Sequence, residues 1–142
     1  MDARVFPLKR TFMGRFGYSM EALTEIKYLA AKEGITLAYF TVIGACQEAT
    51  LAFYDQENKE YLEKDFDEPL EVVSMTGNLM KKNKEIAVHA HVILGRDDGS
   101  TIAGHLISMR MFAGELFLQE LDGEINRLLD EKTGLYLMDL EE

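Results

Sequence analysis

Hydrophobic residues recur at every second position along most of this chain, a spacing that is typical of β-strands. Segments rich in β-branched and aromatic residues alternate with short polar turns. We expect strands over residues 5–10, 35–43, 48–54, 61–66, 70–77, 85–94, 101–107, 115–121 and 135–140. Because Pro7 has no backbone N–H to donate, the first of these strands should lie at a sheet edge.

One segment, between Ser19 and Gly34, instead repeats its apolar residues at helical spacing. Ser19 is a favourable N-cap, and glycine is favoured just past the end of a helix. Residues 125–129 are ambiguous between a strand and a helical turn. Since one main helix accompanies many strands, we predict an α+β fold in which the helix packs on a mainly antiparallel sheet, in a single domain over residues 1–142.

The hairpin predicted over residues 85–107 is apolar on both of its faces. An antiparallel sheet in a small monomer usually leaves one face polar, and a single helix can cover only one face. The second face is therefore a predicted subunit interface, and the alternative is a second covering helix near residues 125–129. One face consists of Val88, Ala90, Val92, Leu94, Ile102 and Leu106, and the other carries Ala87, Ile93, Ala103, Ile107 and Met109.

All three histidines of the chain lie in this hairpin, at His89, His91 and His105. Side chains two residues apart on a strand point the same way, so His89 and His91 should lie roughly 6.5 Å apart along it. If Asp97-Asp98-Gly99 forms a three-residue loop with its glycine in the left-handed conformation, His91 faces His105. All three imidazoles then share one face. A two-residue loop would send His105 to the opposite face, because a shift of one residue reverses every side chain.

Three imidazoles on one patch are the ligand set of an open tetrahedral zinc site, with three nitrogens and one vacant position. The alternative is a structural role, since a single histidine on an apolar strand is usually a hydrogen-bonded core or interface residue. The surrounding patch of Ala87, Ala103 and Ile107 would be small and apolar, with room for a carboxylate or a carbonyl oxygen at the metal. Cys46 is a further candidate ligand or nucleophile, although a single free thiol is far more often a packing residue.

Acidic residues outnumber basic ones by 25 to 15, which gives a net charge of -10. Nucleic-acid-binding domains usually carry a basic face, because neutralising phosphates supplies much of their affinity. The one basic cluster, at residues 81–84, has the character of a solvated turn, so direct DNA binding is disfavoured. We recognise no signal peptide and no apolar run of the ~20 residues that a membrane span needs. The single cysteine fits a reducing cytoplasm.

The sequence resembles the plant-and-prokaryote-conserved (PPC) domain family from about Arg4 to Leu140. The resemblance rests on the order and spacing of seven motifs in this sequence. They are Ser19-Met-Glu-Ala-Leu, Val42-Ile-Gly-Ala45, Ala49-Thr-Leu-Ala-Phe-Tyr-Asp55, Glu68-Pro-Leu-Glu-Val-Val-Ser-Met-Thr-Gly77, His89-Ala-His-Val-Ile-Leu-Gly95, Gly104-His-Leu106 and Thr133-Gly-Leu-Tyr-Leu-Met-Asp-Leu140.

This resemblance implies a compact homotrimer in which His89, His91 and His105 bind zinc or another divalent metal. It also implies a fold similar to that of acetolactate decarboxylase, where a three-histidine zinc polarises a small oxygenated acid. Plant members carry an Arg-Gly-Arg-Pro AT-hook that enters DNA, and this chain has no such motif, although the family label of DNA binding extends to it.

Two classes of function remain open at this point. The first is a regulatory or ligand-binding module, and the second is a metal-dependent enzyme acting on a small oxygenated acid. An enzyme would need an acid or base beside the metal, for which Glu71, Glu115 and Arg110 are candidates. The binding module is favoured because the sequence places none of these side chains beside the histidines.

Overall fold

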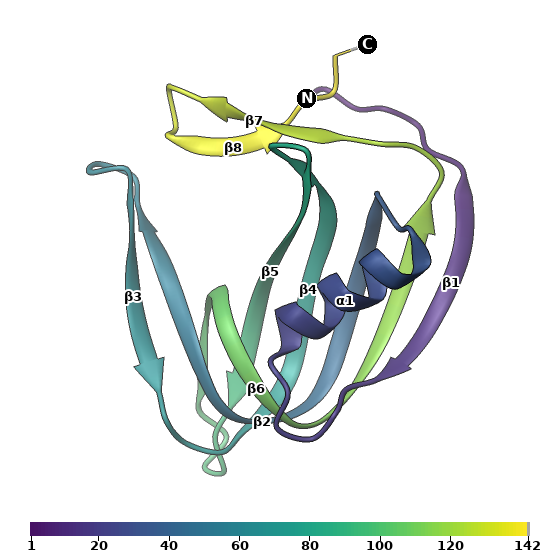
Figure 1. The fold of residues 1–142 in the computed structure, drawn as a ribbon. Helices are drawn as coiled ribbons and strands as arrows, with labels where there is room; N and C mark the ends of the chain where they lie inside the picture. Colours follow the sequence, from purple (N-terminus) through teal and green to yellow (C-terminus); the bar gives the residue numbers. More distant parts are fainter. Residues whose placement is uncertain (142) are drawn as a thin grey trace.

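The computed structural model describes residues 1–141, which form eight strands and one helix (Figure 1). The elements are β1 (Leu8–Arg15), α1 (Ala22–Glu33), β2 (Ala38–Asp55), β3 (Glu60–Phe66), β4 (Leu70–Lys82), β5 (Glu85–Gly95), β6 (Thr101–Leu121), β7 (Asn126–Asp130) and β8 (Leu135–Met138). All the strands belong to one sheet, and only the short β4–β7 pairing is parallel. The predicted α+β fold, mainly antiparallel with one helix, is confirmed. None of the described helical segments is long and apolar enough to cross a membrane.

Two long strands, β2 and β6, bend and thereby close part of the sheet into a ring. Strand β2 pairs with both β4 and β6, and β5 pairs with the same two strands. The predicted strands 35–43 and 48–54 are therefore one continuous strand, and so are 101–107 and 115–121. Near Gly44 the backbones of β2 and β6 approach each other closely. A Cβ on Gly44 would lie 2.2 Å from the Ala113 carbonyl oxygen. Glycine here permits backbone contact and does not end the strand.

The helix begins two residues later than the sequence predicts. Its N-cap is Glu21, whose carboxylate accepts hydrogen bonds from the backbone N–H groups of Leu23 and Thr24. Ser19 lies outside the helix with a positive φ of 63°, and its hydroxyl donates to Gln47. A longer side chain at the cap position thus replaces the serine as the acceptor for the first free N–H groups. The C-terminal prediction is confirmed, since Gly34 is left-handed and its N–H bonds to Ala30.

The core fills the inward side of the ring, and α1 packs against it through Ala22, Ile26 and Ala30. The largest buried side chains include Phe40 of β2 and Leu118 of β6. The outward side chains of β1, β2, β4, β5 and β6 form the opposite surface, which we call the open face. Several of its apolar side chains are more than 40% exposed: Met13, Tyr39, Ile43, Ile93 and Phe117.

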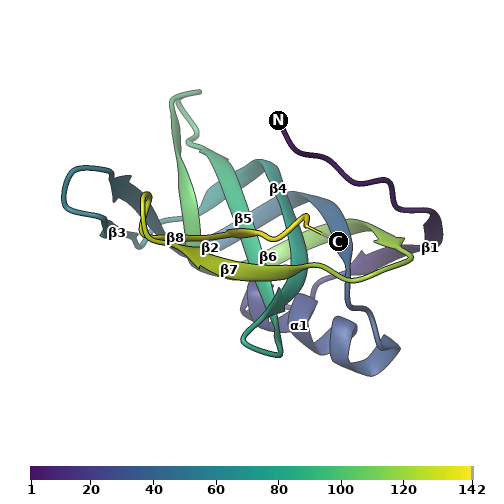
Figure 2. The same ribbon diagram turned by 90° about the horizontal axis from the view of Figure 1, so that it is seen from above.

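Residues 126–130 form strand β7, so a second covering helix in this region is wrong. Strands β7 and β8 make a hairpin that crosses over one end of the sheet beside β4, as Figure 2 shows from above. The tip of this hairpin meets the tip of the β2–β3 hairpin. There the Tyr54 hydroxyl donates to the Thr133 carbonyl oxygen and the Lys59 ammonium to that of Glu131. The apolar side chains of the open face named above remain exposed.

Candidate metal centre

The turn between β5 and β6 sets the register that the sequence predicts. Gly99 has a φ of 83°, and its N–H bonds to the carbonyl oxygen of Arg96. The N–H of Arg96 in turn bonds to Ser100, which closes the three-residue loop. In this register His91 lies directly opposite His105. The predicted placement of the histidines on one face of the hairpin is confirmed.

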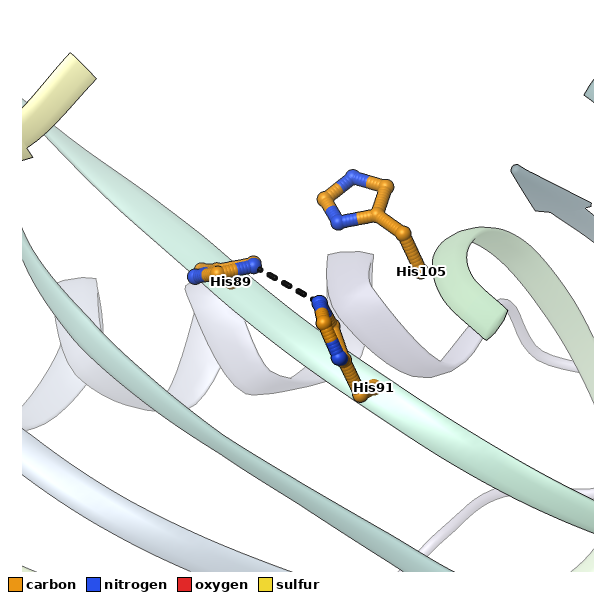
Figure 3. A group of neighbouring side chains, drawn as sticks. All are labelled: His89, His91 and His105. Carbon is orange, nitrogen blue, oxygen red and sulfur yellow. Dashed lines mark hydrogen bonds between the residues drawn. The ribbon is translucent and has the colours of Figure 1, made fainter. Parts of the chain in front are cut away.

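The three imidazoles converge on the open face (Figure 3). One ring nitrogen from each lies within 4.8 Å of those of the other two. The Nε2 atoms of His89 and His91 are 3.3 Å apart. Two nitrogens bound to one tetrahedral zinc at about 2.0–2.1 Å are separated by about 3.3–3.4 Å. The β5 pair therefore already has the spacing of two zinc ligands, and a small movement of the His105 ring would bring a third nitrogen to the same distance.

The protonation of the cluster also suits metal binding. Burial lowers the pKa of His89 to about 4, and the positive charge of Arg127 and the two other imidazoles add to the effect. Burial is also the main cause that lowers the pKa of His105, with a contribution from His91. Metal ligation requires neutral imidazole with a free lone pair. Both half-buried rings therefore hold that form at neutral pH.

One buried ring nitrogen provides a direct test of whether these residues fit a metal. Nδ1 of His105 is buried, and none of the described residues forms a hydrogen bond with it. An unsatisfied buried polar atom costs about 1–3 kcal/mol. A metal ion at the cluster is a partner for such an atom, and the donor set of three neutral nitrogens is one that zinc prefers. The residues present therefore fit a zinc-type ion.

Two further side chains flank the cluster, and sequence reasoning missed both. The ring of Tyr61, on β3, stacks on His105 with a centroid distance of 4.6 Å and an interplanar angle of 28°. Arg127, on β7, donates a hydrogen bond of 2.7 Å to Asn78, the residue directly opposite His89 on β4. They come from the two hairpins that border the open face, so no local pattern in the sequence could reveal them.

The other candidates from the sequence lie elsewhere. Cys46 is buried on the inward side of the ring, and burial raises the pKa of its thiol to about 11. A fourth ligand or nucleophile at this position is therefore wrong. Arg110 is held in an ion pair by Glu48, while Glu71 pairs with Gly95 and Glu115 with Ile43 along the sheet. Among the described residues, the cluster with metal-ligand geometry consists of histidines alone.

The family model of the Plants and Prokaryotes Conserved (PCC) domain matches residues 4–122. The chain belongs to this family, also written PPC, and the resemblance seen in the sequence is confirmed. No protein of curated function matches it.

Three solved structures are similar over nearly their whole length. A metal-containing protein of Archaeoglobus fulgidus shares 39% identity, with a TM-score of 0.93 and coverage of 97% of this chain and 99% of the other. A PPC protein of Pyrococcus horikoshii shares 37% identity, with a TM-score of 0.93 and coverage of 100% and 99%. A candidate DNA-binding protein of Bacteroides thetaiotaomicron shares 29% identity, with a TM-score of 0.88 and coverage of 98% and 100%.

A more distant likeness concerns the fold alone. Acetolactate decarboxylase of Bacillus subtilis subspecies spizizenii shares 14% identity, with a TM-score of 0.55 over 84% of this chain and 55% of that enzyme. The predicted similarity of fold is confirmed. At this identity the similarity carries no information about activity, and this chain matches only about half of the enzyme's length.

Proposed function

We propose that this chain is a metal-dependent ligand-binding module, in which His89, His91 and His105 hold one Zn²⁺ or similar divalent ion. The observation that carries the proposal is the 3.3 Å separation of the His89 and His91 Nε2 atoms, with the third ring within 4.8 Å. The metal-containing relative from Archaeoglobus fulgidus supports it. Three protein ligands leave a tetrahedral ion with one open position, where a carboxylate or carbonyl oxygen of a small ligand can bind and be polarised.

The arrangement supports a binding module more than an enzyme. The candidate acid and base residues lie elsewhere: Glu71 is opposite Gly95 in the sheet, Glu115 is opposite Ile43, and Arg110 forms an ion pair with Glu48. Near the histidines, Tyr61 and Arg127 supply a hydroxyl and a fixed positive charge. Both groups hold their protons at neutral pH, since burial raises the pKa of Tyr61 and an arginine is effectively always charged. They therefore suit recognition of a ligand more than proton transfer.

The first prediction concerns metal content. Untagged protein purified without chelator should contain about one zinc-type ion per chain by elemental analysis, and the His91→Ala variant should contain almost none, because two ligands hold a metal far less tightly than three. Thr76→Ala is the matched control, since Thr76 lies directly opposite His91 on β4 and offers no nitrogen. Equal metal content in the wild type and in His91→Ala would refute the proposed site.

The second prediction concerns DNA. We expect no saturable binding by the isolated protein at ~150 mM salt, because its net charge of -10 repels phosphates over a Debye length of ~8 Å. Fluorescence anisotropy with random and A·T-rich duplexes is the measurement. Sub-micromolar saturable binding would contradict the prediction and would favour a DNA-binding regulator, the description that the Bacteroides thetaiotaomicron relative carries.

A further inference from the structure

Among the residues that the structure describes, Arg127 is a half-buried cation without an ion-pair partner. Its Nη2 donates to the Asn78 side-chain oxygen at 2.7 Å, and its Nη1 donates to the Tyr136 carbonyl oxygen at 3.1 Å. Its Nε is buried and forms no hydrogen bond with any described residue. Within residues 1–141 no carboxylate lies within ion-pair distance of the guanidinium, whereas Arg10, Arg96 and Arg110 all have such partners. Burial accordingly lowers the pKa of Arg127 from its usual value.

This cation lies beside the histidine cluster. Asn78, its hydrogen-bond partner, is the cross-strand neighbour of His89. Arg127, Asn78 and His89 line one cavity, beneath the β7–β8 hairpin. The two Nη groups of the guanidinium are fixed by β8 and β4, and its buried Nε is the donor left without a partner among the described residues.

Positive charge gathers at the histidine end of this cavity once a metal is bound. Three neutral imidazoles contribute no negative charge, a divalent ion adds two positive charges, and Arg127 adds a third. Four acidic residues also line the cavity, Asp2, Asp130, Asp139 and Glu141, but within residues 1–141 none forms an ion pair with Arg127. The Asp130 and Asp139 carboxylates accept hydrogen bonds within their own turns, from Thr133 and Glu141 respectively. Like charges that share a half-buried site repel each other, and an anion between them reduces the repulsion.

We infer that Arg127 is a specificity-determining residue that restricts the ligand of this site to small carboxylates. One carboxylate oxygen would occupy the open metal position, and the other would accept the unsatisfied N–H of Arg127. Charge-assisted hydrogen bonds of this kind are roughly twice as strong as neutral ones. A neutral amide or alcohol of the same size offers no charge to Arg127 and binds more weakly. This inference rests on the proposed function, because it needs a metal at the histidines.

The test uses protein loaded with Co²⁺, whose visible absorption changes when the open ligand position is filled. Acetate and its neutral isostere acetamide are titrated into the wild type, Arg127→Lys and Arg127→Gln. In the wild type we expect acetate to bind at least about tenfold more tightly than acetamide, as a charged hydrogen bond implies. In Arg127→Gln this preference should shrink severalfold or vanish. Arg127→Lys should restore part of it, because the charge is kept and the planar donor is lost.

The variant Asn78→Ala distinguishes a structural role of Arg127 from a role in ligand recognition. It removes one hydrogen-bond partner of the guanidinium and leaves the charge in place. If Arg127 only fastens the β7–β8 hairpin, Asn78→Ala and Arg127→Gln should lower the melting temperature alike, and the preference for acetate should survive in both. That result would overturn the inference, and so would an unchanged preference in a stably folded Arg127→Gln. Failure of the proposed function is distinct, since the wild type would then take up no stoichiometric Co²⁺ and its absorption would show no bound ion.

Discussion

Removal of zinc by a chelator is expected to lower the melting temperature of the protein by about 10 °C or more. An ion that binds only the folded chain stabilises it by about 4 kcal/mol when its free concentration exceeds the dissociation constant a thousandfold. For a domain of this size, each 1 kcal/mol corresponds to about 2–4 °C. The ion would join β5 to β6 through His91 and His105, which face each other across the hairpin.

Thermal melting with and without chelator, at a fixed protein concentration, measures this effect. The His91→Ala variant is the matched control, because it lacks a full ligand set and should melt at the same temperature under both conditions. A chelator that lowers the melting temperature equally in the two proteins would show that the stabilising ion lies elsewhere. A wild type that does not respond at all would contradict a structural contribution from the metal.

The histidine site could be predicted from the sequence because local chemistry determines it. Gly99 provides the left-handed residue that the loop requires, and the loop length then fixes which side chains face each other across β5 and β6. The periodicity of two places His89 beside His91 without reference to the rest of the fold. A turn and a strand period are both encoded within about a dozen residues, so neither depends on distant contacts.

The surroundings of the site could not be predicted in this way. Tyr61 reaches His105 because β3 pairs with β2 and β2 with β6, and Arg127 is placed beside the histidines because β7 pairs with β4. These contacts join residues more than 40 positions apart in the sequence. No local propensity specifies them. Their absence from the sequence-based description explains why the patch was expected to be small and apolar, while the structure adds a phenol and a guanidinium.

Strand lengths were underestimated for a related reason. In a sequence, Gly44 has the signature of a strand end, since glycine is depleted in strand interiors. In the fold it permits β2 to approach β6 so closely that a side chain at Gly44 would overlap the backbone of Ala113 and Gly114. The pattern correctly identifies a special position. Only the tertiary contact shows that the chain bends there and continues as a strand.

A charge placed on the open face is expected to dissociate the protein into single chains. We propose that the open face is the interface of a homotrimer, because its apolar side chains are exposed on the side of the sheet that α1 does not cover. Phe117 lies in one cross-strand row with Met13, Thr41, Thr76 and His91. An interface over this row would bury apolar area worth about 25 cal/mol per Å² and would reach the edge of the metal centre.

The substitution Phe117→Arg tests this interface, because Phe117 is 41% exposed and its replacement leaves the core intact. Multi-angle light scattering at micromolar concentration should give about three times 16.1 kDa for the wild type and a mass near 16.1 kDa for the variant. An unpaired charge buried in an apolar interface costs several kcal/mol, which is enough to separate the subunits. Tyr28→Arg is the matched control, since Tyr28 is an exposed aromatic residue on α1, away from the open face, and should leave the mass unchanged. A wild type of 16.1 kDa would contradict the assembly, and a Phe117→Arg variant that keeps the wild-type mass would place the interface on another surface.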